Sequence, residues 1–176
     1  YQHDKIISLL PFLPAYAAEN LFFFAALLIG GVFAAIAGLI VGIPTLRLKG
    51  DYLAIATLGF GEIIRVVILN FESVGGARGF TGIHEYSNFF WIYLFVFITL
   101  SIISHLVYSA KGKALLAIRE DEIAAESIGI NVTRYKIIAF TTGAFFAGIG
   151  GGLFAHLMIY LHTNSFTFLK SIDFIM

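Results

Sequence analysis

The feature that most constrains this chain is a long apolar segment that carries no charge. Residues 21–43 read LFFFAALLIGGVFAAIAGLIVGI and contain no Asp, Glu, Lys or Arg. A helix needs roughly 20 consecutive apolar residues to cross the hydrocarbon core of a bilayer. This segment therefore predicts a membrane-spanning helix.

The composition of the whole chain points the same way. Of its 176 residues, 59% are hydrophobic and only 12% are charged, whereas a soluble domain usually carries about 25% charged residues. We therefore expect membrane lipid to surround much of the chain. The formal net charge is zero, which gives no reason to expect a nucleic-acid partner. There is no cysteine, so disulfides and thiol chemistry are excluded.

Further apolar segments indicate an all-α, polytopic membrane protein with about four spans. Residues 89–110 begin with FFWIY, an aromatic group typical of a membrane interface, and residues 137–161 form another apolar segment. Residues 52–69 contain Glu62 and Arg65, and they could either span or form a re-entrant helix; we favour a span. We expect residues 1–176 to be one transmembrane domain and a fragment of a longer protein.

Lys and Arg are distributed unevenly among the segments that join the predicted spans. Residues 44–50 contain Arg47 and Lys49, and residues 70–88 contain only Arg78. The basic residues of segment 111–136 are Lys111, Lys113, Arg119, Arg134 and Lys136. Because short loops rich in Lys and Arg stay inside the cell, we expect 44–50 and 111–136 to be cytoplasmic and 70–88 to be external.

Small residues recur at helical spacing in the first and last predicted spans. They are Gly30, Ala34, Gly38 and Gly42 in the first, and Ala144, Gly148 and Gly152 in the last. Such stripes allow the backbones of two membrane helices to approach closely. The pattern predicts helix packing; close packing that also moves during gating is the sharper alternative, and the sequence does not separate the two.

The predicted cytoplasmic segment has the signals of a short capped helix. Asp121 can cap the N-terminus of a helix over residues 122–128, and Gly129 suits the left-handed position that follows it. Asn131 or Thr133 can cap the next helix. Such an element could lie in the headgroup region as a connector, or it could fit a groove on a soluble partner.

Two stretches of the sequence resemble a known family. Residues 123–129, IAAESIG, resemble the EAA loop of ABC importer permeases, although Ile123 stands where the general pattern has Glu. Residues 112–131 and 46–65 more specifically resemble branched-chain amino acid permeases of the LivM type. The resemblance extends from about residue 30 to the end of the chain.

The resemblance implies a permease subunit of an ABC importer in the cell inner membrane, with leucine, isoleucine and valine as substrates. ABC ATPase subunits would hydrolyse ATP, a second homologous permease subunit would complete the pathway, and a periplasmic or surface binding protein would deliver the substrate. The residues of the implied ATPase-coupling loop are Arg119, Glu120, Asp121, Glu122, Ala124, Ala125, Glu126 and Gly129. The alternatives are an ABC permease for urea, a short amide or a sugar, and a membrane-embedded enzyme.

The pair Glu62 and Arg65 is the other candidate site. Glu62 lies near the middle of its predicted span, where an ionisable side chain is costly and is a functional candidate. Arg65 lies three residues further on the same face and can pair with it. The pair could stabilise helix packing or line the transport route. The five histidines show no metal-binding spacing, and we find no nucleophile–base arrangement or phosphate loop, so we expect no catalytic residue, metal or cofactor.

Overall fold

The computed structural model describes residues 15–72, 75–80, 82–83 and 88–162. The helices are α2 (Ala15–Thr45), α3 (Asp51–Asn70), η2 (Gly76–Arg78), α4 (Phe89–Tyr108), α5 (Ala110–Glu120), α6 (Glu122–Ser127) and α7 (Val132–Met158). In this part of the chain, four helices are long and apolar enough to cross a membrane: α2, α3, α4 and α7. The expected all-α, polytopic fold class is confirmed.

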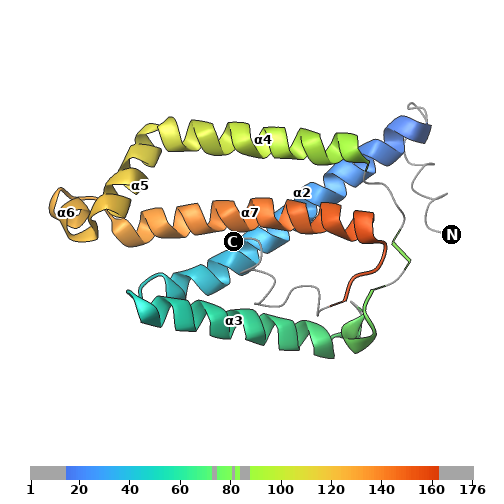
Figure 1. The fold of residues 1–176 in the computed structure, drawn as a ribbon, viewed down its shortest axis with the longest axis horizontal. Coiled ribbons are helices and arrows are strands. Elements are labelled where there is room, and N and C mark those ends of the chain that lie inside the picture. The colour runs from blue at the N-terminus through green and yellow to red at the C-terminus, as the bar shows by residue number, and fades with distance from the viewer. Residues whose placement is uncertain (1–14, 73–74, 81, 84–87, 163–176) are drawn as a thin grey trace.

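The connecting segments gather at the two ends of the bundle (Figure 1). The α2–α3 turn lies at the same end as α5 and α6, where Lys49 approaches Glu122. η2 lies at the opposite end, where Phe80 and Leu161 form an isolated antiparallel bridge. The two segments in which Lys and Arg are concentrated are therefore at one end of the molecule, and the segment with only Arg78 is at the other.

α2 crosses α7 obliquely and packs closely against it (Figure 1). A Cβ atom built on Gly38 of α2 would lie 2.6 Å from the Cβ of Ala144 in α7. A Cβ atom built on Gly152 would lie 2.6 Å from a methyl carbon of Leu27. The close approach of the two backbones therefore depends on small residues in both helices.

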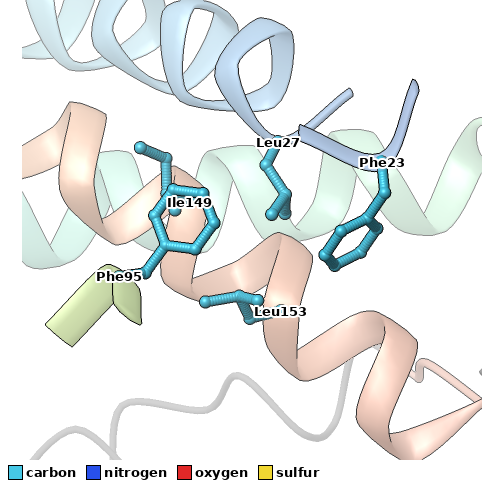
Figure 2. Close-up of a cluster of buried hydrophobic side chains, with 5 residues drawn as sticks. All are labelled: Phe23, Leu27, Phe95, Ile149 and Leu153. Carbon is cyan, nitrogen blue, oxygen red and sulfur yellow. The ribbon is translucent and has the colours of Figure 1, made fainter. Parts of the chain in front are cut away.

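A buried apolar cluster lies beside this crossing. α2, α4 and α7 contribute its members, which are Phe23, Leu27, Phe95, Ile149 and Leu153 (Figure 2). Trp91 at the start of α4 packs against the cluster and meets Phe23 edge-to-face, with ring centroids 5.5 Å apart. The cluster attaches α4 to the α2–α7 pair near the end opposite α6.

α3 is the least packed of the long helices. None of its residues is buried, and its apolar side chains, such as Tyr52 and Ile55, are largely exposed. Since exposed apolar surface of this extent is unfavourable in water, the flanks of α3 are suited to lipid or to further protein.

The helix limits differ from the predicted spans where local capping decides them. α7 begins at Val132, before the predicted residue 137, because Asn131 caps it. It ends at Met158, before the predicted residue 161, and Ile159 is left-handed with φ +59°. α4 ends at Tyr108, before the predicted residue 110, because Ser109 is extended and caps the next helix. A hydropathy pattern does not reveal the capping residues that set these helix limits.

Candidate functional site

α6 is a short helix that local hydrogen bonds fix at both ends. Asp121 Oδ1 accepts hydrogen bonds from the backbone N–H groups of Ile123 and Ala124, at 2.8 and 3.1 Å. These bonds satisfy donors that have no partner inside the helix. The predicted N-cap at Asp121 and the predicted short helix are therefore confirmed.

The C-terminus of α6 closes in a Schellman motif. The N–H of Gly129 donates to the carbonyl of Glu126, and the N–H of Ile130 donates to the carbonyl of Ala125, both at 3.0 Å. This motif needs a left-handed residue at the position that Gly129 occupies, and Gly129 has φ +86°. The chain then enters α7, where Asn131 Oδ1 accepts from the N–H of Arg134 at 3.0 Å.

The inner face of α6 rests on a small apolar core. Ala125 is only 2% exposed and packs with Ile118 of α5 and Val132 of α7. Ile130 and Tyr135 pack around the same cluster. α6 is thus attached to α5 and to the start of α7 by side-chain packing as well as by the chain itself.

The outer face of α6 presents apolar side chains to its surroundings. Ile123 is 72% exposed and Ile128 is 75% exposed. The neighbouring Ala124, Glu126 and Ser127 are exposed as well. Ile123 lies in the first turn of α6 and Ile128 is the residue that caps its C-terminus, so an exposed isoleucine lies at each end of the helix.

Glu122 joins α6 to two other parts of the bundle. One carboxylate oxygen forms an ion pair with Lys136 of α7, and the other lies 4.0 Å from Lys49 Nζ in the α2–α3 turn. The side chains of Glu122 and Lys136 are 27% and 23% exposed, so solvent screens this pair less than a fully exposed one. The resemblance had placed Glu122 in the loop, but its lysine partners are distant in sequence and were not foreseen.

The remaining charged residues of the predicted loop are on its surface. Arg119 and Glu120 pair with each other at 2.7 Å, and their side chains are 72% and 73% exposed. An exposed pair of this kind stabilises a fold by no more than about 1 kcal/mol. These two side chains are therefore available to a partner rather than committed to the fold.

The bend from α4 into α5 controls the position of the whole element. Ser109 Oγ accepts from the N–H of Gly112 at 3.2 Å and so caps α5. Gly112 is buried, and a Cβ atom at this position would overlap the carbonyl oxygens of Leu106 and Val107. Sequence reasoning did not single out Gly112, because its close neighbours depend on the angle of the bend.

Glu62 and Arg65 form the ion pair that their spacing allows. Arg65 Nη1 lies 3.1 Å from Glu62 Oε2, near the middle of α3. The Glu62 side chain is 55% exposed in the described chain, which leaves one side of the pair open to further protein or to a water-filled path.

The predicted small-residue positions are not equivalent. Gly38 faces Ala144, Gly148 faces Ala34, and a Cβ atom on Gly42 would lie 3.1 Å from the Phe140 ring. A Cβ atom on Gly30 would meet nothing within 4 Å, although the Gly30 carbonyl oxygen lies close to Gly148. At Gly30 the backbone carbonyl therefore takes part in the contact between α2 and α7, and the absence of a side chain is not required there.

No metal centre is assembled within the part of the chain that the structure describes. None of its groups of His, Asp and Glu is arranged to hold a metal ion. His105 Nδ1 lies 3.2 Å from the Ser101 carbonyl oxygen of its own helix, and His156 packs edge-to-face on Phe23. Both histidines are accounted for by local packing.

The four spanning helices and the capped element at one end define a multi-pass protein of the cell membrane. Residues 6–176 match the profile of a family described as the permease component of branched-chain amino acid transport systems. The chain belongs to this family.

Two curated relatives support the assignment. The chain is 39% identical to the high-affinity branched-chain amino acid transport system permease protein LivM of Salmonella typhimurium, and 40% identical to the protein of the same name from Escherichia coli. Each comparison covers 85% of this chain and 43% of the relative, so the chain spans less than half the length of these relatives. No solved structure matches the chain significantly.

Proposed function

We propose that the protein to which this chain belongs is a permease subunit of an ABC importer that carries leucine, isoleucine and valine into the cell. The family match and the names of the two relatives support the substrate class. In this proposal separate ATPase subunits hydrolyse ATP, a binding protein delivers the amino acid to the outer face, and a second homologous permease subunit completes the route.

The main structural support for the proposal is the way in which α6 is packed and exposed. Its inner face packs on a buried core, and exposed Ile123 and Ile128 lie at its two ends. A soluble ATPase subunit with an apolar groove would cover these two side chains. Burying one isoleucine is favourable by about 1.5–3 kcal/mol, which is enough to make each of them important for binding.

Rigidity is what this role requires of α6. Caps at both ends, the Ala125 contacts and the Glu122 ion pairs resist deformation of the helix. Movement imposed on α6 by a partner would therefore be passed to α7 and to the α2–α3 turn. Glu62 and Arg65 would act further along the route, either by holding helices together or by lining the path.

Substrate uptake by the complete transporter tests the proposal. The full-length protein is reconstituted with its ATPase, second permease and binding protein, and uptake of labelled leucine, isoleucine and valine is compared with that of urea and sugars. We expect ATP-dependent uptake of the three amino acids only. Uptake of urea or a sugar in place of the amino acids would show that the protein is an ABC permease for another small solute.

A binding measurement separates docking from a role as a headgroup connector. The change Ile123→Asp places a charge on the proposed contact surface without disturbing the buried core, because Ile123 is 72% exposed. We expect the affinity for the ATPase subunit to fall at least tenfold, with Leu116→Asp on α5 as the control. Unchanged affinity would favour the connector.

A further inference from the structure

A pocket of about 460 Å³ opens at the end of the bundle that carries α6. It lies between the segment that follows α2 and the first two turns of α7. The residues that line it are Arg47, Asn131, Thr133, Arg134, Ile137 and Ile138. It is an open depression on the surface of the described chain rather than an enclosed cavity.

The charges around this pocket are not balanced. Lys49 and Lys136 both share the carboxylate of Glu122. Arg47 and Arg134, in contrast, form no ion pair in the described part of the chain, although they come from different segments and line the same pocket. Two guanidinium groups without a carboxylate favour an anion, and their planar geometry matches two oxygens of a phosphate.

The rest of the lining changes from polar to apolar along α7. Thr133 and Arg134 lie in the first turn of the helix, and Ile137 and Ile138 lie one turn deeper into the predicted membrane span. Asn131 already caps this turn by accepting from the Arg134 N–H, so the charge offered to a ligand comes from the arginine side chains. A ligand that fits this order has an anionic group at one end and hydrocarbon at the other.

We propose that this pocket binds an anionic phospholipid, with the phosphodiester on Arg47 and Arg134 and an acyl chain along Ile137 and Ile138. Basic pockets between membrane helices at the cytoplasmic side bind such headgroups. An acidic groove on a soluble partner would also suit Arg47 and Arg134, but it would make no use of the apolar lining at Ile137 and Ile138. The proposal depends only on the chain lying in a membrane and is independent of what it transports.

Lipid titration of the full-length protein tests this site. Phosphatidylglycerol is titrated into the purified protein, and bound lipid is counted by native mass spectrometry, with phosphatidylcholine in a parallel series. The test variant is Arg47→Gln with Arg134→Gln. The control variant is Lys111→Gln with Lys113→Gln, which removes the same charge from exposed positions of α5. We expect at least about tenfold weaker phosphatidylglycerol binding in the test variant, because each lost guanidinium removes charge-assisted hydrogen bonds to the phosphodiester, and a clearly smaller loss in the control, whose lysines lie outside the pocket.

Four results would overturn the proposal. Equal losses in the two double variants would mean that the surface charge acts without a specific site. Full displacement of the lipid by inorganic phosphate at matched concentration would mean that the acyl chain contributes nothing. Unchanged lipid binding with weaker ATPase binding in the arginine variant would assign the pocket to the protein partner. If the double variant does not fold, the single changes Arg47→Gln and Arg134→Gln should each weaken lipid binding at least about threefold, and no change in either would equally refute the proposal.

Discussion

The crossing of α2 and α7 gives the most quantitative prediction, because the structure distinguishes two glycines that look alike in the sequence. Gly30 and Gly38 lie on the same helix and belong to the same predicted stripe. A methyl group on Gly38 would lie 2.6 Å from the Ala144 Cβ, whereas a methyl group on Gly30 would meet no atom of the described residues within 4 Å. We therefore expect Gly38→Ala to disrupt the crossing and Gly30→Ala to leave it intact.

The size of the effect follows from these distances. Carbon atoms pack best about 3.5–4.0 Å apart, so the helices must separate by about 1 Å to accept the methyl group at Gly38. Overpacking of this kind costs about 1–3 kcal/mol. Both substitutions gain the same preference of Ala over Gly within a helix, about 0.5–1 kcal/mol. That gain cancels in the comparison, so the two variants should differ by the packing cost alone.

A compensating change makes the test sharper. Among the described residues, Ala144 is the only close neighbour of the added methyl group, since the next atoms belong to Phe140 at 3.9 Å. Combining Gly38→Ala with Ala144→Gly moves the methyl group from α7 to α2 and should restore stability almost to that of the parent. The measurement is the free energy of unfolding of the full-length protein in mixed micelles. Equal losses from Gly30→Ala and Gly38→Ala, or no recovery in the double variant, would refute the proposed crossing.

Three further predictions concern the ends and the middle of the spans. Gly129→Val should reduce leucine uptake while ATP hydrolysis continues, because φ +86° costs a β-branched residue at least about 1–2 kcal/mol. Gly129→Asn is the control and should largely retain uptake. Unchanged uptake in the valine variant would contradict the role of α6 in passing movement from the ATPase to the spans. Glu122→Lys should lower the melting temperature by placing like charges together, and adding Lys136→Glu should restore it; an unchanged melting temperature in Glu122→Lys would show that the ion pair is dispensable. If the Glu62–Arg65 pair is structural, Glu62→Gln alone should impair assembly of the transporter more than the double change Glu62→Gln with Arg65→Gln. An equal or larger loss in the double variant would favour separate roles of the two residues in transport.

The elements that the sequence predicted well are those with local signals. Asp121 and Gly129 bracket α6, and the hydrogen bonds that fix its ends involve residues close in the chain. The spanning helices could be recognised because each one is long and apolar. Their limits depart from the hydropathy windows because caps decide them: Asn131 was one of the two caps that the sequence predicted, whereas the cap at Ser109 was not predicted.

The contacts between distant segments could not be predicted from the same signals. Lys49 and Lys136 were counted only as positive charges, and nothing in the sequence placed both beside Glu122. Likewise the stripe containing Gly30 and Gly38 has a regular spacing, but the crossing angle of α2 on α7 decides which member lies at the contact. Both features depend on the relative placement of helices that are far apart in the chain.

The uneven packing of the bundle indicates how motion would pass through it under the proposed function. α2 and α7 are locked by small residues and by the cluster around Leu27, so they should move together. α6 is fixed to α7 through Ala125 and Val132, whereas its contact with the α2–α3 turn is a single ion pair between Glu122 and the exposed Lys49 at 4.0 Å. α3 has no buried residue within the described chain. A force applied to α6 should therefore shift the α2–α7 pair as a unit relative to α3, which carries Glu62 and Arg65 at its middle.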